Sequence, residues 1–206
     1  MSLQHAVLGV LEAREMSGYE LTQFFESTAR WVWTAPQSQI YPLLRSMEKD
    51  GLLAGEEQVR GVKLKRTSYA LTAAGRAELT RWLGEVRPLP ANRDAFLLQS
   101  LFLDMVEPHV AAGVLAAHIQ QQRELIEQWS AHQARLLASD TPLLRERLQR
   151  REPDQHERMV RMKAHTFASL IDAASSRIEW AEEAARILGA EPVPVAVTPT
   201  VAPQPR

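Results

Sequence analysis

The hydrophobic pattern of the first 87 residues changes its period part-way along, and this change limits the possible folds more than any other feature of the sequence. Up to position 49, apolar residues recur at helical spacing in three segments. The first two are Leu3–Glu12 and Tyr19–Ala29, and Thr34 is placed to cap the third. Because Pro42 is compatible with a helix only near its first turn, the regular part of the third helix is expected to begin close to Ser38.

After Gly51, a residue that stops helices, the pattern alternates with a period of two, as in β-strands. Arg60-Gly61 is a tight reversal between two such stretches, which predicts a two-stranded hairpin. Thr72 then caps a fourth helical segment that continues through Leu83. Three helices, a hairpin and a further helix, in this order, predict an N-terminal winged helix-turn-helix domain with a two-stranded β wing over residues 1–87.

A second domain of long helices is predicted over residues 92–189, after the proline-containing joint Arg87–Pro90. The whole chain is therefore expected to be mainly α. Two rows of side chains in this domain alternate steps of four and three, which is typical of a helix–helix seam. The rows are Ala111, Leu115, His118, Gln122, Leu125, Trp129, His132 and Leu136, and Val160, Ala164, Phe167, Ile171, Ala174, Ile178, Ala181, Ala185 and Leu188. Residues 190–206, which contain five prolines, are predicted to be a disordered tail.

Several classes of protein are excluded by what the sequence lacks. Without cysteine there can be neither disulfides nor thiolate zinc sites. His118 and His132 are separated by about 21 Å along a helix, so they cannot share a metal ion. No nucleotide-binding or serine-hydrolase motif occurs. We therefore predict a protein that is not an enzyme and has no metal or cofactor. With neither a signal peptide nor an apolar stretch of about 20 residues, it is expected to be cytoplasmic.

The net charge of −1 does not indicate nucleic-acid binding, so that function depends on where the cations lie. The apolar set of the third helix, if buried, leaves a polar face that could read base edges in the major groove of DNA. This face consists of Gln37, Ser38, Gln39, Tyr41, Arg45 and Lys49. The hairpin adds four cations within seven residues, which could contact phosphates: Arg60, Lys63, Lys65 and Arg66. A solvated helix face and a charged sheet edge are the alternatives. The two features together favour DNA binding.

Ordered motifs extend over this same domain. They are Leu8-Gly9-Val10-Leu11, Ser17-Gly18-Tyr19-Glu20-Leu21, Trp33, the run from Gln39 to Leu52, and Tyr69-Ala70-Leu71-Thr72-Ala73-Ala74-Gly75-Arg76. In these residues the chain resembles the PadR-like family of transcriptional regulators, including members with a virulence-activator-like C-terminal helical domain. The resemblance implies a homodimer on a palindromic operator in double-stranded DNA, with the third helix in the major groove and the wing on the backbone. By this resemblance, the residues expected to recognise the operator are Ser38, Gln39, Tyr41 and Arg45. Those expected to contact the DNA backbone are Lys63, Lys65 and Arg66.

The resemblance also implies a repressor of neighbouring detoxification, efflux or virulence genes that a small aromatic or amphipathic effector releases. Residues that could form an effector pocket are Trp33, Phe96, Trp129, His118 and His132. Histidines inside an apolar seam need polar partners, and a hydrogen-bonded core histidine is the alternative. The surplus apolar surface of the helices predicts a dimer interface that includes Phe96, Phe102, Phe167, Ile171, Ile178 and Leu188. An intramolecular three-helix bundle is the alternative.

Two further functions stay open at this point. The winged helix could serve only as a scaffold for protein interaction or dimerisation, with no specific DNA site. The chain could also be a ligand sensor that does not bind DNA specifically. Specific operator binding separates the regulator from both.

Overall fold

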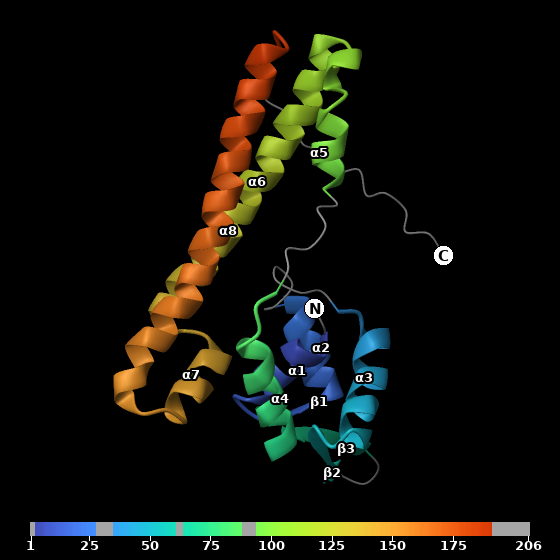
Figure 1. Cartoon of the computed structure of the whole chain (residues 1–206), viewed down its shortest axis with the longest axis vertical. Coiled ribbons are helices and arrows are strands. Elements are labelled where there is room, and N and C mark those ends of the chain that lie inside the picture. The colour runs from blue at the N-terminus through green and yellow to red at the C-terminus, as the bar shows by residue number, and fades with distance from the viewer. Residues whose placement is uncertain (1–2, 28–34, 61–63, 88–93, 191–206) are drawn as a thin grey trace. The chain divides into compact units, whose positions relative to one another are not determined.

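The structure, a computed structural model, describes residues 3–27, 35–60, 64–87 and 94–190, and describes side chains outside positions 58–65 (Figure 1). The predicted proline-rich tail, apart from Ala190, lies outside the described residues. Contacts divide the chain into two compact units. One combines Met1–Leu89 with Thr141–His156, and the other combines Pro90–Asp140 with Glu157–Arg206. Among the described helices, none has the length and apolarity needed to cross a membrane.

The first unit is a winged helix-turn-helix, so the predicted fold class is confirmed. Its elements are α1 (Leu3–Leu11), β1 (Met16–Ser17), α2 (Gly18–Ser27), α3 (Gln37–Lys49), β2 (Leu53–Arg60), β3 (Leu64–Leu71), α4 (Ala73–Leu83) and α7 (Pro142–Gln149). The strands form one antiparallel sheet in the order β1-β3-β2. The sequence predicts only the hairpin β2–β3, because β1 has two residues and shows no periodicity. Ser17 of β1 nevertheless pairs with Ser68, which joins the start of α2 to the wing.

The core of this unit is built from the apolar faces of its helices. Val7 and Leu8 of α1, Phe25 of α2, and Ile40 and Leu44 of α3 are almost completely buried, as their helical spacing predicts. These contacts fix the rotation of α3 about its own axis, so that the residues between the buried positions face outward. The core thus determines which side of α3 is available to a ligand.

The boundaries of the helices agree with the predicted signals except at the start of α3. The residue that precedes α3 is Pro36, and its side chain makes no capping hydrogen bond, so the prediction of Thr34 as the cap is wrong. Thr34 itself lies outside the described residues. Proline cannot donate a backbone hydrogen bond, and it serves here because the first N–H groups of a helix lack internal partners anyway. The helix ends as predicted, with Gly51 at a φ of +72°. The hydroxyl oxygen of Thr72 accepts the Gly75 N–H at 3.0 Å and caps α4 as predicted.

Helix α7 belongs by its contacts to the first unit, although its sequence position is far from it. Leu143 packs against the core, and the Arg147 guanidinium donates to the carbonyl of Gly9. The Nε of Arg147 lies 3.1 Å from a carboxylate oxygen of Glu12, which also pairs with Arg151. The side chains of Glu12 and Arg147 are only 14% and 16% exposed, so their charges compensate one another in a mostly dry environment. These contacts hold α7 against α1.

The second unit consists of helices. Its elements are α5 (Ala95–Ser100), the 3-10 helix η1 (Leu103–Met105), α6 (Pro108–Leu137) and most of α8 (Pro153–Ile187). Helices α6 and α8 lie side by side and antiparallel (Figure 1). Two contacts join them: Arg123 pairs with Glu182 at 3.6 Å, and the Gln133 amide donates to the Ala164 carbonyl. Their buried residues come largely from the two predicted rows. Those of α8 are four alanines and one phenylalanine, Phe167.

Candidate nucleic-acid interface

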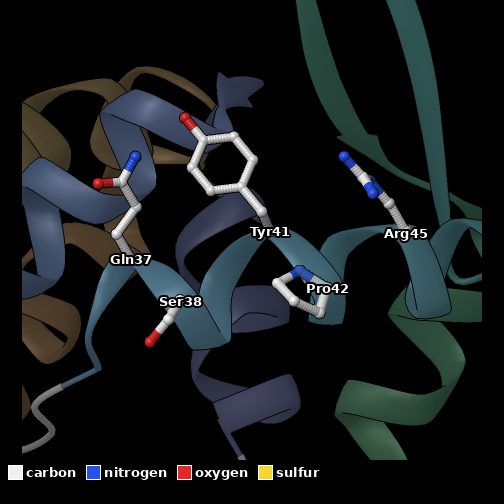
Figure 2. Close-up of a pocket in the computed structure, with 5 residues that line it drawn as sticks. All are labelled: Gln37, Ser38, Tyr41, Pro42 and Arg45. Carbon is white, nitrogen blue, oxygen red and sulfur yellow. The ribbon is translucent and has the colours of Figure 1, made fainter.

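The outward face of α3 carries the polar residues that the sequence predicts for DNA recognition. All of them are exposed except Tyr41, which is half-buried: Gln37, Ser38, Gln39, Tyr41, Arg45 and Lys49. Figure 2 shows Gln37, Tyr41 and Arg45 extending from the same side of α3, as residues spaced by four in a helix do. With Ser38 and Pro42 they line an open hollow of about 470 Å³. This face can offer amide, phenol and guanidinium groups together.

The position of Tyr41 depends on Gly18, the first residue of α2. A Cβ atom at Gly18 would lie 2.6 Å from Cε1 of the Tyr41 ring and 3.0 Å from Cζ. Such distances are well inside van der Waals contact. Glycine at this position therefore leaves room for the ring where it lies in this structure. The sequence places Gly18 in a motif shared with the family, but its contact with Tyr41 becomes visible only in the structure.

The wing is held against α3 by Glu48. A carboxylate oxygen of Glu48 accepts the backbone N–H of Gly55 in β2 at 3.2 Å. Tyr69 of β3 is buried nearby, and this burial raises the pKa of its hydroxyl. The Glu48 carboxylate raises that pKa further, while the charge of Arg45 lowers it. Arg45 and Glu48 thus both act on the Tyr69 hydroxyl of β3, and Figure 2 shows Arg45 beside the strands of the hairpin.

The four cations of the wing are not equivalent. Strands β2 and β3 pair from Leu53 with Leu71 to Arg60 with Leu64. Arg60 and Lys65 therefore lie at the far end of the hairpin, but their side chains are outside the described part, and so is Lys63. Arg66 is described, and its guanidinium forms an ion pair with Glu20 of α2. The sequence shows no acidic residue among the wing cations, yet the fold brings one to Arg66.

Glu20 belongs to a capping box at the start of α2. The hydroxyl oxygen of Ser17 accepts the Glu20 N–H at 3.3 Å, and the Glu20 carboxylate accepts the Ser17 N–H at 2.9 Å. Burial alone would raise the pKa of this carboxyl, but the Ser17 N–H, Arg66, the Ser17 hydroxyl and Arg14 outweigh it and lower the pKa to about 2. The motif Ser-x-x-Glu is a recognisable helix-start signal, so the sequence could have revealed this role for Glu20. It contains no signal for the pairing with Arg66.

The residues predicted for an effector pocket fall into two groups in the second unit. Phe96 stacks on His118, with ring centroids 3.5 Å apart, and burial lowers the pKa of His118. His132 packs on Phe167 at 4.6 Å and is three residues from Trp129. Trp129 follows His118 by eleven positions in α6, which is about 16 Å along a helix. Within the described residues, His118 Nε2 and Trp129 Nε1 are buried without a hydrogen-bond partner. Trp33 lies outside those residues.

The residues predicted for dimerisation differ in exposure. Phe96, Ile178 and Leu188 pack on a core cluster of their own unit, Phe167 is 8% exposed, and Phe102 is 55% exposed. Ile171 is half-buried. Exposed apolar side chains gather instead along the segment that runs from α5 through η1 to the start of α6. They are Leu97, Leu98, Leu101, Phe102, Met105, Val106 and Val110.

Comparison with known proteins identifies the family. Residues 7–81 match the family model described as "Transcriptional regulator PadR-like family". The "Negative transcriptional regulator PadR" of Bacillus subtilis (strain 168) is 30% identical over 142 residues, which are 68% of this chain and 78% of that protein. The chain belongs to the PadR-like family of transcriptional regulators. The predicted resemblance is therefore confirmed, and this regulator is a DNA-binding protein and not an enzyme.

Solved structures show the same fold. The crystal structure of Bacillus subtilis PadR in complex with operator DNA has a TM-score of 0.72 and 24% identity to the regulator, covering 90% of this chain and 98% of that one. The crystal structure of the same protein in complex with p-coumaric acid has a TM-score of 0.68 and 23% identity, covering 91% and 98%. The shared fold thus extends over both units of the regulator.

Proposed function

We propose that the regulator is a cytoplasmic, homodimeric repressor that binds a palindromic operator with α3 in the major groove. The observation that carries this proposal is the polar side of α3, where Gln37, Gln39 and Arg45 are exposed while Ile40 and Leu44 are buried in the core. A short helix with polar side chains on its free face is the part of a helix-turn-helix that enters the major groove. The name of the Bacillus subtilis relative, a negative regulator, and its crystal structure with operator DNA support the same function.

The proposal gives the polar residues distinct tasks. Arg45 donates two hydrogen bonds to a guanine edge, and Gln37, Ser38, Gln39 and Tyr41 contact neighbouring bases from the first half of α3. Lys49, Arg60, Lys63 and Lys65 contact phosphates, where they contribute affinity but little sequence preference. Arg66 is already paired with Glu20, and its main effect on DNA is through the position of the wing.

The proposed dimer covers the exposed apolar surface of the second unit. An apolar patch on a protein surface is a common sign of an interface, and Phe102 is a member of this one. Two winged domains in one dimer can occupy half-sites about 34 Å apart, the repeat of the DNA helix. The target genes are proposed to be neighbouring genes for detoxification, efflux or virulence.

A small aromatic compound is the proposed effector. The Bacillus subtilis relative has been crystallised with p-coumaric acid, which makes this compound the first probe to use. The candidate residues are Trp33, Phe96, Trp129, His118 and His132. Among the described residues of this set, His118 and Trp129 each have a buried ring nitrogen without a hydrogen-bond partner, and both residues belong to the second unit.

Fluorescence anisotropy on the regulator's own promoter, with random DNA of equal length as competitor, tests DNA recognition. We expect Arg45→Ala to lower the preference for the promoter by about tenfold or more, since one good base contact contributes about 1–3 kcal/mol of discrimination. Lys63→Ala and Lys65→Ala should weaken binding to both DNAs equally and reduce the salt dependence. Arg161→Ala, an exposed arginine of α8, is the control. An unchanged preference in Arg45→Ala would show that α3 does not read the operator.

The same preparation distinguishes the other two functions. A chain that sediments as a dimer but shows no promoter preference would be an interaction module. Saturable quenching of tryptophan fluorescence by p-coumaric acid, again without promoter preference, would indicate a ligand sensor. The proposed repressor instead loses promoter binding when p-coumaric acid is added and regains it when the compound is removed.

A further inference from the structure

The first unit contains a continuous line of ion pairs that starts on the wing and ends on α7. Arg66 of β3 pairs with Glu20 of α2. The other carboxylate oxygen of Glu20 lies 3.3 Å from a terminal nitrogen of Arg14. The Nε of the same Arg14 lies 2.9 Å from a carboxylate oxygen of Glu146 on α7. Arg14 thus forms ion pairs with two carboxylates through two different nitrogens. The pair with Glu20 is also a hydrogen bond, whereas Glu146 Oε2 is buried without a hydrogen-bond partner among the described residues, so its contact with Arg14 is electrostatic.

The fold explains why these distant residues meet. Ser17 in β1 pairs with Ser68 in β3, and Arg66 is two residues from Ser68, on the same face of the sheet. The capping box fixes the Glu20 carboxylate beside Ser17, so it lies within reach of Arg66. Arg14 occupies the connection between α1 and β1, on which α7 is docked through Glu12. Arg66, Glu20 and Glu146 are therefore carried by β3, α2 and α7, and Arg14 by the connection on which α7 is docked.

We propose that Glu20 is a positioning residue for the wing, and that Arg14 links it to α7, so that the position of α7 determines the position of the wing. The four side chains are between 31% and 38% exposed, which is enough to keep their charges solvated but partly fixes their geometry. Only three residues separate α7 from α8, the longest of the described helices. A displacement of α8 can therefore reach α7 through a short connection. The inference rests on the proposed function, because that function gives the wing its role in DNA binding.

Hydrogen–deuterium exchange of the β3 amides, measured without DNA, tests the link by itself. Exposed or half-exposed ion pairs contribute little, so Glu146→Gln is expected to speed exchange in β3 by about twofold to fivefold. Glu152→Gln makes the same change of charge in the segment after α7, outside this line of ion pairs, and is the control. The exchange of β3 in Glu152→Gln should equal that of the wild type.

Double variants separate the bridge from general electrostatics. Arg14→Lys retains the charge, but a single ammonium cannot replace two guanidinium nitrogens that face different carboxylates. In an Arg14→Lys background, Glu146→Gln should therefore have no further effect on β3, and the same holds in a Glu20→Gln background. If Glu20→Gln does not fold, as judged by circular dichroism, the Arg14→Lys background makes the comparison. An equal effect of Glu146→Gln in both backgrounds and in the wild type would overturn the proposal, as would an effect no larger than that of Glu152→Gln.

Promoter binding then shows whether the link acts on function. Glu146→Gln should lower promoter affinity by about the factor seen in exchange, and only when Arg14 and Glu20 are intact. If the exchange results hold but the wild type shows no promoter preference, the link between α7 and the wing stands and the proposed function fails. If the promoter is bound specifically but Glu146→Gln leaves exchange in β3 unchanged, the proposed function stands and the link between α7 and the wing fails.

Discussion

The contact between Gly18 and Tyr41 allows the effect of one methyl group to be worked out in advance. In Gly18→Ala the new Cβ atom would start 2.6 Å from Cε1, 3.0 Å from Cζ and 3.1 Å from Cδ1 of the tyrosine ring. An ordinary contact between carbon atoms is about 3.5–4.0 Å, so the ring must retreat by about 1 Å. All three atoms belong to the side chain of Tyr41, and the helix backbone can therefore stay in place.

The change in the free energy of unfolding caused by Gly18→Ala can be estimated from these distances. Overpacking of this kind costs about 1–3 kcal/mol, from which the better helix propensity of alanine subtracts up to about 1 kcal/mol. We expect the free energy of unfolding to fall by about 1–2 kcal/mol, which corresponds to about 2–8 °C in Tm for a chain of this length. Because Tyr41 moves on the face proposed to contact DNA, promoter affinity should fall as well.

A double-mutant cycle with Tyr41→Ala isolates the contact. Once the ring is removed, Gly18→Ala should cost nothing or slightly stabilise the protein, which gives a coupling energy of about 1–2 kcal/mol. Gly9→Ala is the control, since Gly9 lies within α1 and a Cβ atom there would meet nothing within 4 Å. It should stabilise the protein by up to about 1 kcal/mol. Thermal unfolding followed by circular dichroism measures all four variants. The reasoning is refuted if Gly18→Ala costs the same with and without the Tyr41 ring.

Two more predictions concern the framework of the winged domain. In Gly75→Ala the Cβ atom would overlap the carbonyl oxygen of Leu52, which is a backbone atom and cannot move aside as a side chain can. The free energy of unfolding, measured by thermal unfolding, should therefore fall by about 3 kcal/mol. A loss smaller than that of Gly18→Ala would contradict this view. The second concerns acid: because the pKa of Glu20 is lowered from 4.5 to about 2 on folding, its stabilising effect is present above pH 4.5 and is lost as the pH falls toward 2. The difference in Tm between the wild type and Glu20→Gln should therefore shrink over that interval, and a constant difference would show that Glu20 does not titrate as inferred.

The elements of the winged domain could be predicted because their signals are local. A helix of α3's length shows its buried face through spacing alone, and Ile40, Leu44 and Met47 are buried as that spacing predicts. Thr72 and Gly51 act on the next few residues of backbone, so their effects can be read directly from the sequence. The strand β1 escaped prediction because two residues are too few for a period, and Pro36 because it starts a helix without a side-chain cap.

The candidate site likewise has a part that could be predicted from the sequence and a part that could not. The outward residues of α3 follow from the burial of the others, so the sequence alone identified Gln37, Gln39 and Arg45 as exposed groups on one helix. It could not show that the guanidinium of Arg66 forms an ion pair with Glu20, because Glu20 is 46 residues away along the chain. Nor could it show that α7 docks on α1, since Arg147 and Gly9 are 138 residues apart.

The sequence by itself thus determined the helices and the hairpin of the winged domain, the polar face of α3 and the rows of α6 and α8, since hydrogen bonding and hydrophobic period act between near neighbours. Only the tertiary structure decided which charges meet, which glycine supports Tyr41 and which unit holds α7. Those contacts join segments that are distant in the chain, and no local pattern records them, because a surface arginine has the same sequence signature whether it faces water, a phosphate or a carboxylate.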